Sequence, residues 1–181
     1  MCAASVPALT YQEVGITRDL PEGPLPAGAH LLRLRTPLGR GEQVLRAAGE
    51  ALLRFDMQRG AGLRVRASAP VADVGVEVTL YAGLGPLRLP APCRVVWRVD
   101  ETDRVGYGYG TLPGHPESGE EGFLVARLPD DSVWLTVTAV SRAATWYTRA
   151  AGPLGRLGQR FIARRYARAL RRLGARGSQL F

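Results

Sequence analysis

The sequence contains no lysine and no asparagine, so all 24 of its basic side chains are arginines. Without lysine, the chain cannot form a Schiff base on a side-chain amine and cannot supply the lysine of a phosphate-binding P-loop. The serine nucleophile elbow, Gly-X-Ser-X-Gly, is absent as well. These absences exclude several common enzyme mechanisms.

Cysteines and long apolar runs are also scarce. Cys2 and Cys93 are too few for a disulfide framework. No apolar run approaches the ~20 residues that a membrane-spanning helix requires. The first residues, MCAASVPAL, lack the positive region and the long apolar run of a signal peptide. We therefore expect a cytoplasmic protein that does not cross a bilayer.

Positive charge is concentrated at one end of the chain. The net charge is +8, and residues 151–181 contain arginines but no acidic residue. On a helix, four of these arginines form a stripe, namely Arg156, Arg160, Arg164 and Arg171. A solvated helix face is the favoured interpretation, and a peripheral contact with an anionic membrane or an acidic partner is the alternative. Nucleic-acid binding is disfavoured because the aromatic residues lie apart from the arginines.

Hydrophobic periodicity predicts a single α+β domain over residues 1–181. Residues 1–28 are rich in proline and turn signals, so we expect an irregular N-terminal segment. A strand near residues 30–35, ended by residues 37–41, precedes a helix over Glu42–Gln58. Six antiparallel strands follow, near Leu63–Ala67, Val74–Ala82, Leu87–Val99, Gly106–Leu112, Gly122–Leu128 and Val133–Arg142.

The last predicted element is a long helix over residues 153–173, followed by a short tail, 174–181. Pro153 suits a first helical turn, and Gly174 suits the end of a helix. Apolar residues, Phe161 and Tyr166 among them, cover one broad arc, so this helix is expected to pack on the sheet with its arginines in water. The element order is typical of a START-like helix-grip fold, in which a curved antiparallel sheet wraps a long C-terminal helix around an internal cavity.

Five segments carry a closer resemblance: TYQEVGITR (10–18), MQRGAGLRV (57–65), APCRVVWRVDE (91–101), YGTLPGHPESGEEGFLV (109–125) and WYTRAAGPLGRLGQRF (146–161). They resemble the motifs of an uncharacterised domain-of-unknown-function family with bacterial and plant members, which is itself similar to the START-like, or SRPBCC, group. The TLPGHPE segment is the most specific of them. The resemblance implies the helix-grip fold and brings no established activity or catalytic residue.

Alternating glycines mark one predicted strand. Its two faces carry Gly106, Gly108 and Gly110 on one side and Tyr107, Tyr109 and Thr111 on the other. Three interior glycines indicate a sharp bend, the close approach of a helix, or room for a ligand, and the bend or helix contact is favoured. Trp97 is expected to share an apolar strand face with Val95 and Val99. The candidate ligand-binding residues are Trp97, Tyr107, Tyr109, Thr111 and His115.

The polar segment after this strand holds His115, with Glu117 and Glu120 close by in the sequence. A histidine beside a carboxylate can act as a general acid or base, so these three residues are the candidate catalytic groups. A structural role, with a proline-defined turn and glutamates paired with arginines, is favoured over catalysis. No spacing matches a metal site, and no metal or cofactor is predicted. His30 is expected to be a partly buried strand residue, and Cys93 a buried, inert thiol.

The leading functional hypothesis is a cavity-forming domain, without an assigned reaction, that binds a small hydrophobic or amphipathic molecule between the sheet and the last helix. The first alternative is a small enzyme of hydrolase, cyclase or isomerase type that uses His115 with Glu117 or Glu120. The second is an interaction module that uses the arginine stripe on an anionic membrane or an acidic partner. The sequence does not specify the ligand, the pathway or the oligomeric state.

Overall fold

The computed structural model describes residues 7–18, 25–84 and 87–177, and the side chains of residues 84, 87, 146–157, 159 and 175–177 lie outside this description. Its elements are β1 (His30–Arg40), α1 (Glu42–Leu53), α2 (Asp56–Gly60), β2 (Arg64–Ala67), β3 (Glu77–Leu84), β4 (Leu87–Asp100), β5 (Arg104–Thr111), β6 (Glu117–Arg127), β7 (Ser132–Ala143) and α3 (Trp146–Gly177). The seven strands form an antiparallel sheet in the order β1-β7-β6-β5-β4-β3-β2. This confirms the predicted α+β helix-grip fold class.

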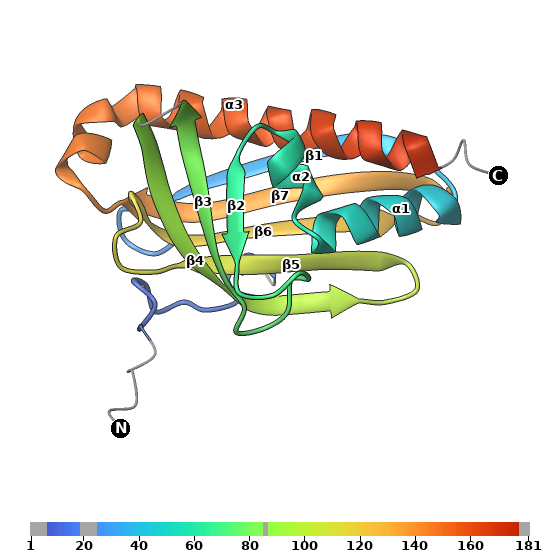
Figure 1. The fold of residues 1–181 in the computed structure, drawn as a ribbon, viewed down its shortest axis with the longest axis horizontal. Coiled ribbons are helices and arrows are strands. Elements are labelled where there is room, and N and C mark those ends of the chain that lie inside the picture. The colour runs from blue at the N-terminus through green and yellow to red at the C-terminus, as the bar shows by residue number, and fades with distance from the viewer. Residues whose placement is uncertain (1–6, 19–24, 85–86, 178–181) are drawn as a thin grey trace.

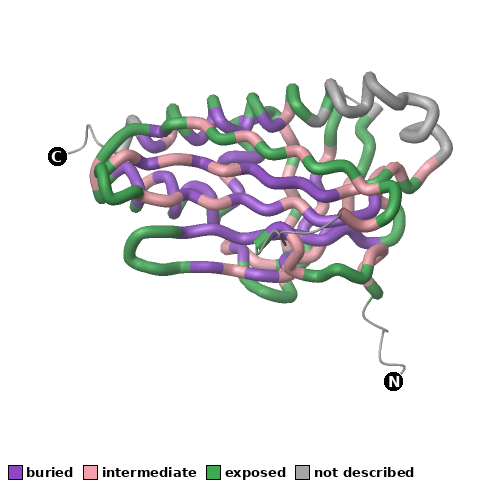
Figure 2. The backbone as a smooth tube through the Cα atoms, turned by 180° about the vertical axis from the view of Figure 1, so that it is seen from behind, coloured by how far each residue is buried: buried purple, intermediate pink, exposed green. Residues whose placement is uncertain are grey.

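The curved sheet wraps around α3, which runs along its concave side (Figure 1). β3 and β4 curl towards the N-terminal half of α3, whereas α1 and α2 lie under its C-terminal half. Fully buried side chains from the helices and the central strands pack between these layers, including Leu52, Phe55, Met57, Phe123 and Leu135. Figure 2 shows that burial follows the strands, while the turn between β4 and β5 is exposed. Because α1 and α2 lie under the C-terminal half of α3, the N-terminal half is covered by the sheet alone.

The helix predicted over residues 42–58 is broken in two. α1 ends at Leu53, and Phe55 adopts a left-handed conformation with φ 60° before α2 begins at Asp56. The break turns the Phe55 ring into the core, where it meets Tyr107 edge-on at 5.6 Å between ring centroids. Apolar spacing continues through the break, so periodicity alone does not reveal it.

A bulge in β4 changes which side chains share a face. Val95 pairs with Tyr109, but Trp97 pairs with Gly108, so the register shifts by one residue between them. Val95 therefore belongs to the concave core, whereas Trp97 lies on the convex face. The prediction that Val95, Trp97 and Val99 share one face is wrong, because one extra residue inverts the alternation of a strand.

The ends of two other elements also differ from the prediction. β6 begins at Glu117 rather than at Gly122, so the glutamates predicted in a loop belong to a strand and alternate between its faces. α3 begins at Trp146, and Pro153 lies inside it. Phe161, predicted on the packed arc, is 52% exposed and lies under the Arg165 guanidinium. The buried face of α3 lies nearly opposite, at Ala163, Tyr166, Ala167 and Leu170.

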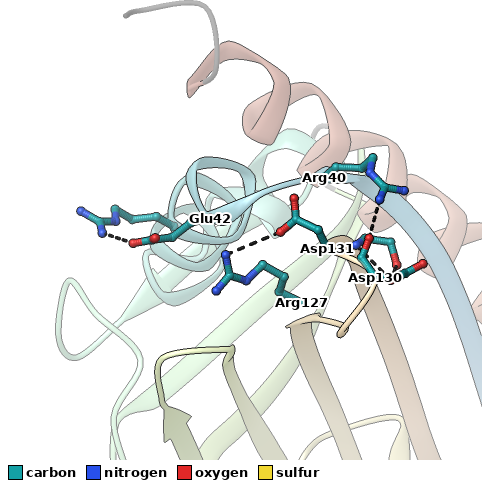
Figure 3. Close-up of polar contacts among 7 residues, drawn as sticks. Arg40, Glu42, Arg127, Asp130 and Asp131 are labelled. Atoms are coloured by element: carbon teal, nitrogen blue, oxygen red, sulfur yellow. Dashed lines mark hydrogen bonds and ion pairs between the residues drawn. The ribbon is translucent and has the colours of Figure 1, made fainter.

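Hydrogen bonds and an ion pair hold the turn between β6 and β7 beside the start of α1 (Figure 3). Arg40 donates a hydrogen bond to the Asp130 carbonyl, and Arg127 lies 3.6 Å from the Asp131 carboxylate. The Gly41 amide also donates to the Asp131 carbonyl at 3.0 Å. These contacts join the end of β1 to the end of the sheet that lies farthest from the N-terminal half of α3.

Candidate functional site

A cavity of about 260 Å³ lies between the concave face of the sheet and α3. Aliphatic side chains form much of its wall, namely Leu32, Leu63, Leu80, Ala91, Ala139 and Ile162. Its polar groups come mainly from β5, β6 and the segment between them, and from α3: Tyr109, Thr111, His115, Glu117, Glu121 and Tyr166. No arginine occurs among the described residues that line it. The cavity is therefore largely apolar, and the carboxyl groups at its wall have no arginine beside them among the described lining residues.

Glu121 lines the cavity from β6. It pairs across the sheet with Tyr109, whose hydroxyl donates a hydrogen bond of 2.6 Å to Glu121 Oε2. Burial raises the pKa of Glu121 from 4.5 to about 7, and the hydrogen bond from Tyr109 opposes this rise only in part. Glu121 was not among the residues that the sequence singled out. The signal that could have identified it is its registration opposite Tyr109, which depends on where β6 begins.

Two tyrosines and a phenylalanine form an aromatic floor beside Glu121. The rings of Tyr109 and Phe123 lie 5.4 Å apart, and those of Phe123 and Tyr166 lie 5.6 Å apart. Burial raises the pKa of both tyrosines well above the usual value, and the nearby Glu121 charge adds to this. Both phenols therefore remain neutral and can donate hydrogen bonds.

His115 lies at the same cavity, in the turn that leads into β6. Its Nδ1 accepts a hydrogen bond of 2.9 Å from the Glu117 amide, and Ser141 Oγ donates one of 3.1 Å to the Glu117 carboxylate. Burial lowers the pKa of His115 from 6.5 to about 4, so the imidazole is neutral at neutral pH. The structure thus brings His115 and Glu117 together, with the histidine bound to the backbone of Glu117 rather than to its carboxylate.

Glu120 has a different environment from its two neighbours in the candidate set. Its carboxylate is 2% exposed and accepts five hydrogen bonds. The donors are Tyr11 OH (2.7 Å), the Gly15 amide (2.7 Å), the Thr17 amide (3.0 Å), Thr17 Oγ1 (2.5 Å) and Trp97 Nε1 (3.0 Å). All five donors are neutral, so the arginine pairing expected for Glu120 is not what holds it. Glu120 fastens the N-terminal segment to the convex face.

The alternating glycines of β5 lie on the same convex face, where they leave room for side chains to pack against the strand. A β-carbon at Gly108 would overlap the Trp97 indole, and one at Gly110 would overlap the Tyr11 phenol. On β6, a β-carbon at Gly122 would lie 2.6 Å from both Trp97 and Thr17. The bare face thus receives two aromatic side chains rather than a helix. The favoured interpretation missed this contact because the bulge at Trp97 and the folding back of residues 10–17 are both non-local.

The predicted ligand-binding residues are divided between several places. Tyr109, Thr111 and His115 line the cavity, whereas Trp97 lies on the convex face. Tyr107 is fully buried next to the cavity residues, and its hydroxyl accepts a hydrogen bond of 2.7 Å from Gln58 Nε2. Thr111 Oγ1 also accepts from the Gly119 amide at 3.0 Å, which fixes its rotamer.

The remaining sequence candidates lie away from the cavity wall. His30 is exposed, in contrast to the partly buried position expected for it, because β1 is an edge strand. Cys93 is buried, and burial raises the pKa of its thiol well above the usual value, which agrees with an unreactive thiol.

The arginine stripe on α3 faces solvent where it is described. Arg160, Arg164 and Arg171 are exposed, whereas the side chain of Arg156 lies outside the described residues. Arg164 and Arg171 also border a groove of about 210 Å³ between α3 and β1. Whether these arginines contact a membrane or an acidic partner stays a prediction.

In the described part of the chain, none of the helices is long and apolar enough to cross a membrane. Within the same residues, no three histidine, cysteine or acidic side chains are grouped as metal ligands.

Several solved structures share this architecture at low sequence identity. Ara h 8.0201 matches with a TM-score of 0.56 at 9% identity, covering 82% of this chain and 99% of that one. The major latex-like protein 151 of Panax ginseng matches with a TM-score of 0.54 at 13% identity, covering 80% and 97%. Norcoclaurine synthase of Thalictrum flavum matches with a TM-score of 0.53 at 13% identity, covering 80% and 86%. At these identities the likeness establishes the fold alone.

Sequence comparison places the chain more narrowly. The profile described as "Domain of unknown function (DUF1990)" matches residues 10–169. A UPF0548 protein of Deinococcus radiodurans is 40% identical over 173 residues, which cover 90% of this chain and 86% of the relative. The matched region includes β1 to β7, the described cavity and most of α3. The chain therefore belongs to the DUF1990, or UPF0548, family and has a START-like helix-grip fold.

Proposed function

We propose that this protein binds a small hydrophobic or amphipathic molecule in the cavity beneath α3. The observation that carries the proposal is the cavity itself, of about 260 Å³, with a mainly aliphatic wall and a few polar groups. Binding sites for small molecules are typically apolar pockets with a few placed polar groups. Protein interiors are otherwise close-packed, and an empty space of this size leaves its lining atoms without packing partners.

The residues that line the cavity define the expected contacts of the ligand. Its apolar part would contact Leu32, Leu80 and Ile162, and its polar part would lie near Tyr109 and Glu121. A similar fold accommodates a small molecule in another protein, since one norcoclaurine synthase structure was determined in complex with a transition-state analogue. That likeness supports the capacity of the fold and says nothing of the ligand here.

Native mass spectrometry of the protein purified from its own cells tests the proposal. We expect a co-purifying small molecule that dissociates under denaturing conditions. Ala139→Phe places a ring in the cavity and should abolish the adduct, whereas Ala27→Phe, the same change at an exposed position, should retain it. Absence of any adduct from the native protein, together with failure of hydrophobic probes to bind it, would overturn the proposal.

A second candidate function is acid–base catalysis on the bound molecule, of hydrolase, cyclase or isomerase type. The observation that favours it is the meeting of Glu121, with a pKa of about 7, and neutral His115 in one cavity. Groups that exchange protons near the working pH are effective general acids and bases. Incubation of the protein with its extracted ligand should then yield a product that Glu121→Gln does not form. A ligand that stays unchanged in this assay would leave binding as the whole function.

A further inference from the structure

We infer that the ligand carries a cationic group, an amine or a related nitrogen base, which lies against Glu121. This inference rests on the proposed ligand-binding function and specifies its chemical class. It is drawn from the charges on the cavity wall and from the incomplete hydrogen bonding of one partly buried carboxylate.

The charges of the cavity wall are of one sign. Glu117 and Glu121 both line it, as does Glu120, whose carboxylate is bound by donors on the convex face. Among the described lining residues there is no arginine, although the chain has 24 arginines and a net charge of +8. The histidine at the wall is neutral at neutral pH because burial lowers its pKa to about 4. An anionic ligand would therefore meet carboxylates of like charge with no compensating cation. A cationic ligand would meet two carboxylates of opposite charge.

The hydrogen bonding of Glu121 is less complete than that of Glu120. Within the described residues, Glu120 accepts five hydrogen bonds, whereas Tyr109 supplies the side-chain hydrogen bond to Glu121, at Oε2. A buried carboxylate without sufficient partners is costly, and the cost is relieved either by a proton or by a cation. A ligand ammonium group would form a charge-assisted hydrogen bond with the carboxylate in place of the proton.

The groups around Glu121 do not supply that positive charge. Tyr107 and Tyr109 approach from β5, Tyr166 from α3 and Cys93 from β4. Burial raises the pKa of each of these groups, so all four are neutral near pH 7. A positive charge next to Glu121 must therefore come from the ligand, and its arrival would release the proton that Glu121 holds.

Calorimetry with three probes of equal chain length tests the inference: octylamine, 1-octanol and octanoate at pH 7 and low salt. Octylamine should bind about tenfold more tightly than octanol, because one charge-assisted hydrogen bond in a buried site is of this size. Octanoate should bind most weakly. In buffers of different ionisation enthalpy, octylamine binding should release about half a proton at pH 7.

Two variants separate the role of Glu121 from general charge effects. Glu121→Gln should reduce the preference for octylamine over octanol to within about twofold and abolish proton release, while octanol affinity is retained. Octanol binding by this variant also shows that it is folded. Glu42→Gln, which removes an exposed carboxylate on α1, should change none of these values.

The possible failures are distinguishable. If octanol or octanoate binds the native protein as tightly as octylamine, or if Glu121→Gln keeps the preference, the cationic-ligand inference is overturned and ligand binding stands. If none of the three probes binds and native mass spectrometry shows no adduct, the proposed binding function is itself overturned, and the inference falls with it. If none binds although an adduct co-purifies, the cationic-ligand inference alone is overturned.

Discussion

Glu120 and Glu121 are neighbours in the sequence, yet they lie on opposite faces of β6, where Glu120 is buried and Glu121 is partly buried. Glu120 has five neutral donors from the N-terminal segment and Trp97, whereas Glu121 has one donor from Tyr109 and borders a cavity. The first carboxylate is saturated and holds the structure together. The second retains bonding capacity that a ligand can use.

The same contrast extends to the two faces of the sheet. The convex face is closed at this point, because glycines let Trp97 and Tyr11 lie against the strands and Glu120 fixes both. On the concave face, α1 and α2 lie under the C-terminal half of α3. The cavity borders the same helix at Ile162 and Tyr166. Four substitutions test whether one face is structural and the other functional.

The largest effect is expected from Glu120→Ala, which removes the acceptor of five buried or partly buried donors. We expect the free energy of unfolding to fall by about 3–5 kcal/mol, because each buried donor left without a partner is costly. Urea denaturation measures this change. Glu120→Gln keeps one carbonyl oxygen and should lose less. A loss below about 1 kcal/mol for Glu120→Ala would show that Glu120 is not a structural anchor.

Glu121→Gln should change the dependence of stability on pH. The folded-state pKa of about 7 lies above the ordinary 4.5, so the folded protein binds this proton more tightly than the unfolded chain does. The resulting stabilisation is complete below pH 4.5 and is lost as the pH rises through 7. Relative to the native protein, the variant should therefore gain on the order of 2–3 kcal/mol between pH 4.5 and pH 8.

The comparison with the native protein is needed because His115 acts in the opposite direction. Its folded-state pKa of about 4 lies below 6.5, so its contribution is present above pH 6.5 and is lost as the pH falls towards 4. This contribution is common to both proteins and cancels in their difference. Urea denaturation across the pH range gives that difference, and a constant value would contradict the raised pKa of Glu121.

Gly108→Ala tests the close packing of the convex face. The added methyl group would overlap the Trp97 indole, so we expect a loss of about 1–3 kcal/mol and a red shift of tryptophan emission as the ring is displaced. Gly158→Ala is the matched control, because nothing lies within 4 Å of its β-carbon position on α3, and the change should be neutral or slightly stabilising. Equal effects at both sites would argue against the contact.

Tyr109→Phe should have the smallest effect on stability, about 1 kcal/mol, because it removes a single hydrogen bond. Its main consequence is electrostatic. The Tyr109 hydroxyl lowers the pKa of Glu121 relative to burial alone, so the variant should raise that pKa above about 7. Titration of the ¹³C-labelled Glu121 carboxyl group by NMR measures the shift, and an unchanged midpoint would remove Tyr109 from the site.

Much of the fold follows from local patterns in the sequence. Turn residues and period-two alternation separate the strands, and the apolar spacing of residues 42–53 specifies α1. The ends of elements are less well determined. β6 extends to Glu117 because β7 pairs with its first residues, whereas β5 pairs with it only from Glu120 onwards. The β4 bulge depends on Trp97 finding space over Gly108. Neither of these non-local contacts can be identified from a short stretch of sequence.

The candidate site shows the same division. The sequence by itself determined that the segment around His115 would carry the polar groups, that lysine chemistry is absent, and that α3 would cover the sheet. Only the tertiary structure decided which of two adjacent glutamates has its carboxylate beside Tyr109 of the cavity wall and which is bound by Trp97 on the convex face. The reason is physical: alternate residues of a strand point to opposite faces, so a shift of one residue exchanges an anchored carboxylate for an available one.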